Sequence, residues 1–488
     1  MSCAAVMLQG TGSEVGKSLL VAGLGRACAR RGLRVRPFKP QNMSNNAAVT
    51  PDGSEIGRAQ AMQARACGVP FSVDMNPVLL KPQTDLGAQI IVHGRIWRNA
   101  GAGEYQALEG ELLRKMLESF ARLGSGADLI LIEGAGSPAE INLPGADIAN
   151  MGFADAADVP VILVGDIERG GVIASIVGTL ALLAPAHGAR LKGYIVNKFH
   201  GDPRLFDGGL RAIGERTGLE CLGVVPYFTD ARRLPAEDAV TVEAQQPAGN
   251  RPIRIAVPVF PRIANFDDFD PLIAEPDVAV DMVKAPTALP GDADLIVLPG
   301  SKATLADLAF MREVGWDVDI VAHWRRGGAV LGICGGYQML GQRIGDPDGI
   351  EGMPANAPGL GLLDVETELS AGKTLTEVAG TEPASGEPVA GYEMHIGRTT
   401  GPDTRRPMLD LETGAEGAIS ADGRVRGCYV HGLFAKDPFR HAFLSRLKAR
   451  RASGLAYEEE LDQVLDGLAD HLEAHLEVDR ILEVAGVR

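Results

Sequence analysis

The stretch AVLGICGGYQMLG, Ala329–Gly341, decides the interpretation of the C-terminal half of this chain. An apolar run ends on Cys334, glycines stand on both sides of this cysteine, and a helix-like pattern follows them. The stretch predicts a strand, a sharp turn and a helix, with a thiol at the turn. Glycine suits such a turn because its backbone angles and close chain approach exclude larger side chains.

Two interpretations of Cys334 are open from this stretch alone. A lone intracellular cysteine is commonly a buried structural residue. A thiol held clear of a sheet edge is instead typical of a nucleophile, and its partners then lie elsewhere in the sequence. Gly300 and Ser301, in LPGS after another predicted strand, are candidates to form an oxyanion hole with Gly335. His431, at the end of the strand CYV, is the candidate base.

Composition limits the classes of protein that this chain can belong to. Its 488 residues predict more than one domain, and 45% hydrophobic with 23% charged residues is typical of an α/β enzyme. A net charge of −16 argues against nucleic acid or an anionic membrane as partner. The six cysteines form no C-x-x-C pair, and there is no signal peptide or long apolar run. We therefore expect a cytoplasmic protein.

The N-terminal residues predict a nucleotide site. Residues 4–8 form an apolar run, GTGSEVGKS follows at Gly10–Ser18, and an apolar-periodic helix begins at Leu19. A strand, a glycine-rich loop, Lys-Ser and a helix form the arrangement that cradles phosphates with backbone amides. Gly12 and Gly16 belong to this loop, and its Lys17 and Ser18 would neutralise phosphate and ligate magnesium.

Polar side chains follow further predicted strands of this half. KPQNMSNN, with Lys39, Gln41 and Asn42, comes after the strand 34–38. It is either a surface turn or a phosphate or substrate site at the strand's carboxyl end, where doubly wound sheets bind ligands. Glu133 ends the apolar strand DLILI beside the P-loop and is expected to bind magnesium with Ser18.

The P-loop has five residues between Gly10 and Gly16, one more than the usual spacing. In this it resembles the loop of the dethiobiotin synthetase-like P-loop ATPases. The resemblance implies that Lys39 faces the transferred phosphate and that Glu55 is a further magnesium ligand. Asn197, in the NKFHGD stretch, resembles the base-recognition element of P-loop proteins, which implies a contact with adenine.

The segments LPGS, GICGGYQ and YVHG, in this order, resemble a class I glutamine amidotransferase domain. The resemblance implies that Cys334 attacks the glutamine carboxamide, with His431 as base, and that Gln338 holds the glutamine backbone. That family usually has a Glu two residues after the histidine, and here this position is Leu433. The sequence therefore leaves open how His431 is oriented.

A dethiobiotin synthetase-like ATPase domain fused to a class I glutamine amidotransferase domain is similar to the cobalamin-pathway amidases. The implied fold class is α/β, with two doubly wound, mostly parallel sheets. The expected domains are an ATP-dependent amidoligase domain over residues 1–232, a linker over 233–251, and an amidotransferase domain with C-terminal helices over 252–488.

The resemblance implies an ATP-, Mg²⁺- and glutamine-dependent carboxylate amidoligase that acts on a corrinoid. The blocks KPQNMSNN and GDIERGG are the most specific part of this resemblance, which implies amidation of the b, d, e and g carboxylates of adenosylcobyrinic acid a,c-diamide. Amidation of the a and c carboxylates of cobyrinic acid is the nearest alternative. A nucleotide-switch ATPase with an inactive amidotransferase domain is a third, which the retained Cys334 and His431 disfavour.

Overall fold

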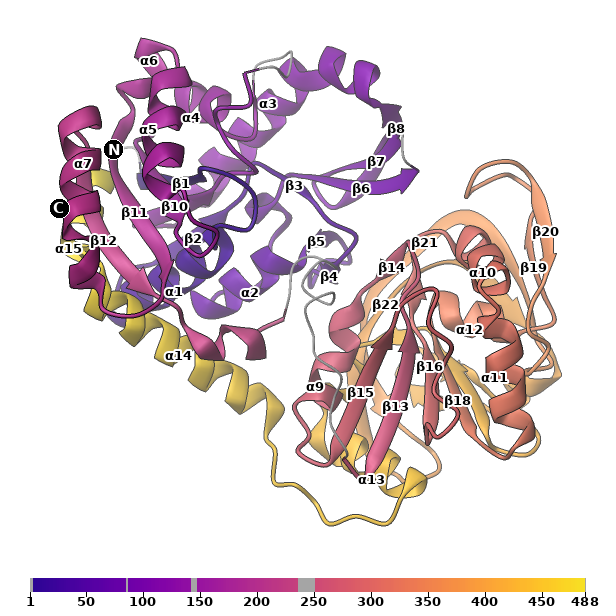
Figure 1. The fold of residues 1–488 in the computed structure, drawn as a ribbon. Coiled ribbons are helices and arrows are strands. Elements are labelled where there is room, and N and C mark those ends of the chain that lie inside the picture. Colours follow the sequence, from indigo (N-terminus) through magenta and orange to yellow (C-terminus); the bar gives the residue numbers. More distant parts are fainter. Residues whose placement is uncertain (1–2, 85–86, 142–146, 236–250, 488) are drawn as a thin grey trace. The chain divides into compact units, whose positions relative to one another are not determined.

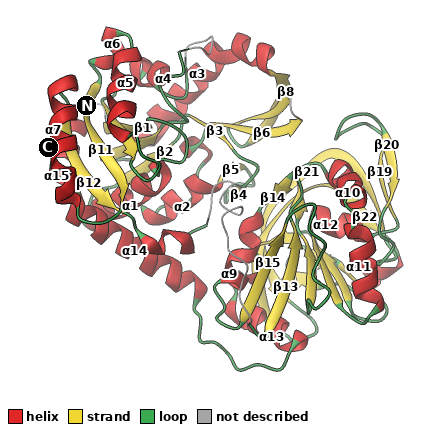
Figure 2. Ribbon diagram, viewed as in Figure 1, coloured by secondary structure: helices red, strands yellow, loops and turns green. Residues whose placement is uncertain are grey.

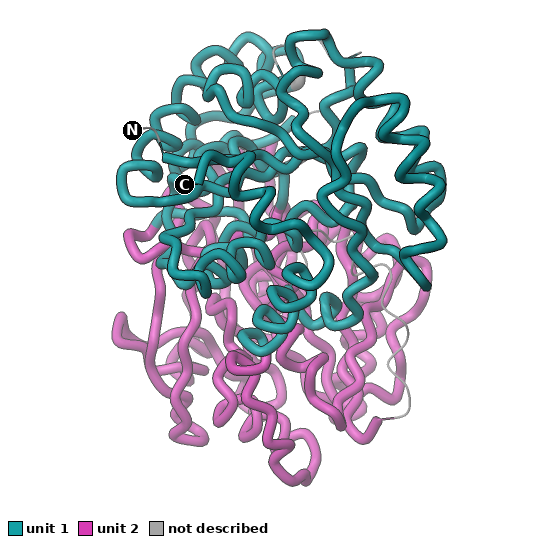
Figure 3. Tube along the Cα trace, turned by 90° about the vertical axis from the view of Figure 1, so that its left-hand side faces the viewer, with its two compact units in different colours: residues 1–44, 54–235, 461–488 teal, residues 45–53, 236–460 magenta. Residues whose placement is uncertain are grey.

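The structure is a computed structural model that describes residues 3–84, 87–141, 147–235 and 251–487. The chain divides into two compact units (Figure 3). Unit 1 comprises Met1–Ser44, Ser54–Pro235 and Leu461–Arg488, and unit 2 comprises Asn45–Gly53 and Ala236–Glu460. These units differ from the expected domains at residues 45–53 and 461–488. Residues 236–250 of the expected linker lie outside the described residues.

Unit 1 is built on a six-stranded parallel sheet in the order β12-β11-β10-β1-β9-β2 (Figure 1). Its inner strands are apolar runs, as expected where helices cover both faces of a parallel sheet. The parallel sheet predicted from the sequence is confirmed. The strands are β1 (Ala4–Gly10), β2 (Val35–Phe38), β9 (Leu129–Glu133), β10 (Val161–Asp166), β11 (Leu191–Phe199) and β12 (Glu220–Pro226).

Alternate residues of β9 point to opposite faces of this sheet. Ile130 and Ile132 share a core with Met116 of α3 and Phe153 of α4. On the other face, Gly25 of α1 lies against Leu131. The helices of unit 1 are α1 (Lys17–Arg30), α2 (Arg58–Ala66), α3 (Ala102–Gly124), α4 (Met151–Ala156), α5 (Val172–Leu182), α6 (Pro185–Gly188), α7 (Asp207–Thr217) and α15 (Val478–Ala485), with 3₁₀ turns η1 (Val73–Met75), η2 (Pro203–Phe206) and η3 (Thr229–Arg233).

The C-terminal helix α14 (Tyr457–His475) packs against α1. A Cβ added to Gly23 of α1 would lie 2.5 Å from Leu472, so glycine permits this close approach. Ion pairs flank the contact, including Arg26 with Asp466 at 2.8 Å. These contacts explain why residues 461–488 belong to unit 1.

A second sheet of unit 1, which the sequence did not predict, has the order β3-β6-β7-β8. Its strands β6, β7 and β8 are antiparallel neighbours, whereas β3 pairs with β6 in parallel. Gln41–Met43 of the motif KPQNMSNN form β3, so the middle of the motif is a strand and not a turn. The bounds are β3 (Gln41–Met43), β6 (Val78–Thr84), β7 (Gly87–Val92) and β8 (Arg95–Gly101), and the short strand β5 (Glu55–Gly57) also lies in unit 1.

Unit 2 contains a six-stranded sheet in the order β15-β13-β16-β18-β26-β25, parallel except for β25 (Figure 2). A larger sheet built around the long hairpin β21-β22 was not expected. The strands are β4 (Ala47–Val49), β13 (Ile253–Pro258), β14 (Ile263–Ala264), β15 (Val278–Val283), β16 (Leu295–Leu298), β17 (Gly300–Ser301), β18 (Ala329–Ile333), β19 (Arg343–Asp346), β20 (Ala355–Pro358), β21 (Glu366–Thr381), β22 (Pro388–Thr400), β23 (Leu409–Leu411), β24 (Gly414–Glu416), β25 (Ala418–Ile419), β26 (Val425–Cys428) and β27 (Val430–His431).

Helices flank the parallel sheet of unit 2, and one apolar core runs through the unit. They are α9 (Asp270–Ile273), α10 (Thr304–Glu313), α11 (Trp316–Arg325), α12 (Gly335–Leu340) and α13 (Asp437–Leu447), with 3₁₀ turns η4 (Phe266–Phe269), η5 (Pro402–Arg405) and η6 (Leu433–Ala435). Within the described ranges of the chain, no helix combines the length and apolar character needed to cross a bilayer.

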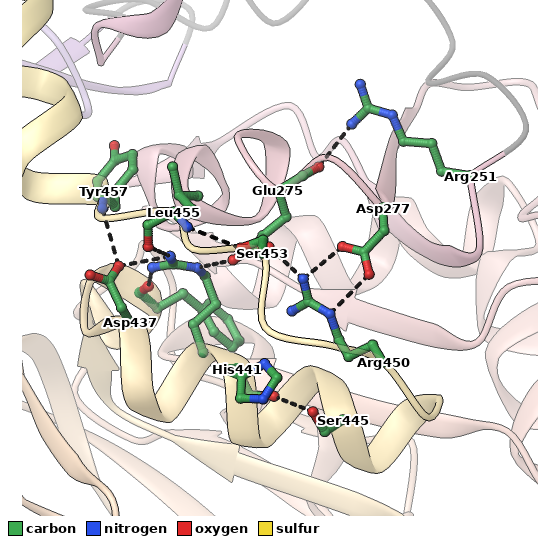
Figure 4. Close-up of polar contacts among 12 residues, drawn as sticks. Arg251, Glu275, Asp277, Asp437, His441, Ser445, Arg450, Ser453, Leu455 and Tyr457 are labelled. Carbon is green, nitrogen blue, oxygen red and sulfur yellow. Dashed lines mark hydrogen bonds and ion pairs between the residues drawn. The ribbon is translucent and has the colours of Figure 1, made fainter.

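A buried charge cluster ties α13 and the following segment to the loop after α9 (Figure 4). Arg440 and Arg450 both contact the carboxylate of Glu275, at 2.7 and 2.5 Å, and Arg450 also contacts Asp277 at 2.7 Å. Arg440 and Glu275 are almost fully buried. Such a carboxylate needs its cations because water does not reach it.

Candidate active site

The P-loop joins β1 to α1 in unit 1. Gly16 precedes α1 with a φ of 93°, in the left-handed region that glycine adopts without strain. A Cβ at this position would lie 2.3 Å from Nδ2 of Asn197, which donates a hydrogen bond to the carbonyl of Val15 at 2.8 Å. Lys17 donates through Nζ to the carbonyl of Gly12 at 3.1 Å. The structure thus brings the predicted nucleotide-binding residues together, and Asn197 holds the loop by a contact that the sequence did not indicate.

Glu133 is the centre of a buried polar cluster next to this loop. Its Oε1 accepts hydrogen bonds from Oγ of Ser18 at 2.9 Å and from Nζ of Lys39 at 2.7 Å. Its Oε2 accepts from Nε2 of Gln63, on α2, at 2.6 Å. The strands β1, β9 and β2 are neighbours in the sheet, so their carboxyl ends bring Ser18, Glu133 and Lys39 to one place. No sequence motif marks Gln63, because it lies inside a helix.

Glu55, the third predicted magnesium ligand, has a different partner in this structure. Its Oε2 accepts from Nζ of Lys81 at 2.6 Å, and both side chains are buried. Asn42 donates to Oε1 of Gln60 at 2.9 Å, and Gln41 accepts a hydrogen bond from the hydroxyl of Tyr105. The predicted substrate residues Gln41 and Asn42 therefore lie on β3 of the second sheet, where side chains from other segments hold them.

Ser18 and Glu133 suit magnesium, because this ion prefers hard oxygen ligands and commonly takes one or two carboxylates with phosphate oxygens and water. Across the described part of the chain, no group of three or more His, Cys, Asp and Glu side chains is placed to hold a metal ion. The donor set accordingly fits an ion that arrives with a nucleotide. The binding of magnesium by Ser18, Glu55 and Glu133 stays a prediction.

Cys334 stands in unit 2 at the expected elbow, between β18 and α12. Its φ of 54° and ψ of −111° place a non-glycine residue in a strained conformation. The chain approaches itself closely here, since a Cβ on Gly336 would lie 2.1 Å from the carbonyl oxygen of Leu298. The strand, elbow and helix predicted from the sequence are therefore present, and the glycine has the steric role expected of it.

The candidate oxyanion residues lie beside the elbow. A Cβ on Gly335 would lie 3.0 Å from the backbone nitrogen of Ser301. A Cβ on Gly300 would lie 3.0 Å from Cε1 of His431. The short strand β17 thus brings Gly300 and Ser301 next to both the elbow and the histidine, and their role in an oxyanion hole stays a prediction.

His431 is buried, and two neighbouring side chains hold its ring. Its ring stacks on that of Tyr392, with centroids 5.4 Å apart. Its Nδ1 lies 2.7 Å from Oδ2 of Asp268, a residue that sequence analysis missed. Burial by itself lowers the pKa of His431, but the neighbouring Asp268 and Cys334, through charge and hydrogen bonding, raise it to about 10. The histidine is thus placed to receive and keep a proton.

Gln338, predicted to hold the glutamine backbone, is bonded within the protein. Its Nε2 donates to the carbonyl of Ile396 at 3.0 Å and to the hydroxyl of Tyr429 at 3.2 Å. Its Oε1 accepts from Oγ1 of Thr304 at 3.1 Å. These bonds hold Gln338 on α12, directly after the elbow, and its contact with glutamine stays a prediction.

His395, which the sequence left without a role, stacks on Tyr429 with ring centroids 3.7 Å apart. Burial, and then the charge of His431, lower the pKa of His395 to about 4. It is therefore a neutral imidazole at physiological pH. Of the two histidines, only His431 has neighbours that favour a positive charge.

Comparison with known families assigns a domain to each half of the chain. Residues 6–242 match the CobQ/CobB/MinD/ParA nucleotide binding domain, and residues 254–439 match the CobB/CobQ-like glutamine amidotransferase domain. A nucleotide-binding domain followed by this amidotransferase domain defines the class of protein, an ATP-dependent, glutamine-hydrolysing amidoligase, as the sequence predicted.

Full-length relatives identify the particular family. Proteins named cobyric acid synthase are 60% identical over 481 residues in Paracoccus denitrificans, 60% over 484 in Methylorubrum populi and 58% over 480 in Methylocella silvestris. Each match covers at least 98% of this chain and at least 99% of the relative. This chain belongs to the cobyric acid synthase family.

Proposed function

We propose that this chain amidates the b, d, e and g carboxylates of adenosylcobyrinic acid a,c-diamide, using ATP and glutamine, to give adenosylcobyric acid. The observation that carries the proposal is the 60% identity to a cobyric acid synthase across 99% of both chains. The geometry of the two sites supports it, because each has the groups that one half of the reaction requires. The cytoplasmic location expected from the sequence stays a prediction.

In unit 1, the chemical problem is that a carboxylate is a poor electrophile. Transfer of the γ-phosphoryl group of ATP to the carboxylate gives an acyl phosphate, which ammonia can attack with loss of phosphate. Lys17 and the amides of the P-loop would hold the phosphates, and Lys39 would face the transferred group. Ser18 and Glu133 would hold magnesium, which would supply positive charge against the phosphate oxygens when bound.

In unit 2, Cys334 and His431 would release ammonia from glutamine. The thiol proton passes to Nε2 of His431 while Sγ bonds to the carboxamide carbon, and amides beside the elbow receive the developing oxyanion. The same proton then goes to the leaving nitrogen, so ammonia departs and a glutamyl thioester remains. Water, deprotonated by His431, hydrolyses this thioester and frees the thiol.

Mass spectrometry of the corrinoid tests the proposal. Wild-type protein with Mg-ATP and glutamine should add four amides to adenosylcobyrinic acid a,c-diamide, and none to the a and c carboxylates of cobyrinic acid. Cys334→Ala should amidate with ammonium but not with glutamine. Cys428→Ala, which removes another buried thiol of the same unit, is the matched control and should still use glutamine.

Preferential amidation of cobyrinic acid would replace the proposal by the a,c-diamide reaction. Glutamine use by Cys334→Ala at the wild-type rate would remove Cys334 from the mechanism. Failure of folded protein to amidate either corrinoid with either nitrogen source would overturn the assignment as a whole.

A further inference from the structure

The carboxylate that faces His431 comes from a distant segment of the chain. Asp268 lies 163 residues before His431, and its Oδ2 is 2.7 Å from Nδ1 of the histidine. Leu433, two residues after the histidine, is fully buried in the apolar core of unit 2. A carboxylate at position 433 would point into this core, whereas the carboxylate of Asp268 lies against the imidazole.

Both oxygens of Asp268 are engaged. While Oδ2 faces the imidazole, Oδ1 accepts a hydrogen bond from the backbone nitrogen of Gly432 at 2.6 Å. The side chain of Asp268 is about 1% exposed, as is that of His431. The carboxylate cannot rotate without breaking one of these bonds, so it fixes the ring of His431 and the backbone that follows it.

The segment that carries Asp268 is built into the same structure as the oxyanion residues. Asp268 lies in the turn η4, directly after β14, and β14 pairs with β17, the strand of Gly300 and Ser301. Asn265 starts the turn with a φ of 52°. Its conformation is locked, because its backbone nitrogen donates to Asn46 at 2.7 Å and its Oδ1 accepts from the nitrogen of Ala47 at 3.2 Å.

We infer that Asp268 is the positioning residue that completes Cys334 and His431 in this chain, in place of the carboxylate missing at position 433. The inference rests on the proposed glutaminase function of Cys334. With Nδ1–H donating to the carboxylate, the lone pair of Nε2 is free to take the thiol proton. The carboxylate of Asp268 then lies against the imidazolium that forms and stabilises it.

The charges around the ring agree with this role. The groups that face His431 are Asp268 from η4, Cys334 from the elbow, and Tyr392 and His395 from β22. Asp268 and Cys334 raise the pKa of His431 against the effect of burial, whereas His395 is neutral. Asp268 is thus the anion that offsets a positive charge on His431 once the thiol has given up its proton.

The test compares Asp268→Asn with Asp267→Asn, which removes the neighbouring carboxylate of the same turn. We expect Asp268→Asn to lower glutamine-driven amidation by about 10²- to 10⁴-fold, because the amide favours the wrong imidazole tautomer. Ammonium-driven amidation should stay at the wild-type rate, which also shows that the variant is folded. Asp267→Asn should match wild type with both nitrogen sources, and Asp268→Glu should restore part of the glutamine-driven rate.

A second readout separates positioning from mere support of the fold. The rate of Cys334 alkylation by iodoacetamide, followed against pH by mass spectrometry of the peptide, should move to higher pH in Asp268→Asn and stay in place in Asp267→Asn. A folded Asp268→Asn protein with wild-type glutamine use and an unshifted alkylation profile would overturn the inference.

The wild-type protein provides a test that needs no folded variant at position 268. The Nδ1 proton of His431, bonded to a buried carboxylate, should give a far-downfield proton resonance that Cys334→Ala retains. Its absence would overturn the inference. Glutamine use by Cys334→Ala, in contrast, would contradict the proposed function itself, so the two failures are distinguishable.

Discussion

Nζ of Lys39 lies 2.7 Å from Oε1 of Glu133, and both side chains are buried in unit 1. The first residue follows β2 and the second ends β9, so neighbouring strands bring a cation and an anion to the same edge of the sheet. Arrival of Mg-ATP at the P-loop would provide Lys39 with phosphate oxygens and Glu133 with a metal ion. Lys39 and Glu133 thus neutralise each other's charge without nucleotide, and each would exchange this partner for a ligand when Mg-ATP binds.

Replacement of Lys39 by Met should stop amidation with glutamine and with ammonium alike, because the step that fails is phosphoryl transfer. The change also leaves a buried carboxylate without its cation, a loss of about 3–5 kcal/mol in unfolding free energy for pairs of this kind. Lys39→Met combined with Glu133→Gln should recover part of that stability but no activity. Urea unfolding and corrinoid mass spectrometry measure the two effects, and normal ammonium-driven turnover by Lys39→Met would contradict this role.

Gly16→Ala should abolish nucleotide binding and destabilise unit 1. The added Cβ meets Asn197 at 2.3 Å, and the backbone at φ 93° disfavours any residue with a Cβ. Gly178→Ala is the control, because a Cβ there meets nothing within 4 Å and alanine favours a helix interior by up to about 1 kcal/mol. ATP titration and thermal unfolding of both variants check this, and tight ATP binding by Gly16→Ala would refute it.

Asp307→Asn should change how stability depends on pH. Burial raises the pKa of Asp307 to about 7, although it accepts a hydrogen bond from Ser301 at 2.5 Å. Between the unfolded pKa of about 4 and this value, the folded protein holds more protons than the unfolded one. Asp307 therefore costs stability progressively as pH rises from about 4 to 7, by up to about 1.4 kcal/mol per pH unit.

The amide variant lacks this titration, so its stability relative to wild type should improve between pH 5 and pH 8. Urea midpoints of the two proteins at these pH values measure the difference. Asp348→Asn, which changes an exposed carboxylate, serves as control and should show no such trend. An equal difference between Asp307→Asn and wild type at both pH values would show that Asp307 is ionised in the folded protein throughout this range.

Arg440→Met should destabilise unit 2 by about 3 kcal/mol, because Glu275 would keep only one of its two buried guanidinium partners. Arg343→Met removes an exposed pair with Glu366 and should cost at most about 1 kcal/mol. Chemical unfolding followed by tryptophan fluorescence compares them, since two of the three tryptophans, Trp316 and Trp324, lie in unit 2. Equal costs for the two variants would mean that burial adds nothing to the Arg440 interaction.

Partly amidated corrinoids should appear in solution during turnover. The four carboxylates occupy different places on one macrocycle, so a single set of rigid contacts cannot hold all of them in turn, and the substrate must leave and rebind. Time courses by liquid chromatography and mass spectrometry should show mono-, di- and tri-amidated species that rise and fall. Samples that contain only substrate and final product at every time would contradict release between steps.

The sequence by itself determined those features that a short stretch of chain encodes. The spacing of Gly10, Gly16, Lys17 and Ser18 predicts a phosphate loop between a strand and a helix, and the glycines around Cys334 predict an elbow. Local steric and hydrogen-bonding needs impose both patterns, so they can be recognised without knowledge of distant residues. The two parallel sheets follow from the alternation of apolar runs with helical segments.

Only the tertiary structure decided which side chains from distant segments contact the residues of the phosphate loop, the elbow and the other motifs. Asp268 and Gln63 have no motif of their own, because an aspartate in a turn and a glutamine in a helix are ordinary surface residues by pattern. Lys81 likewise became the partner of Glu55 only through the pairing of distant segments. Burial makes these polar contacts necessary, and the long-range packing that buries them leaves no periodic trace in the sequence.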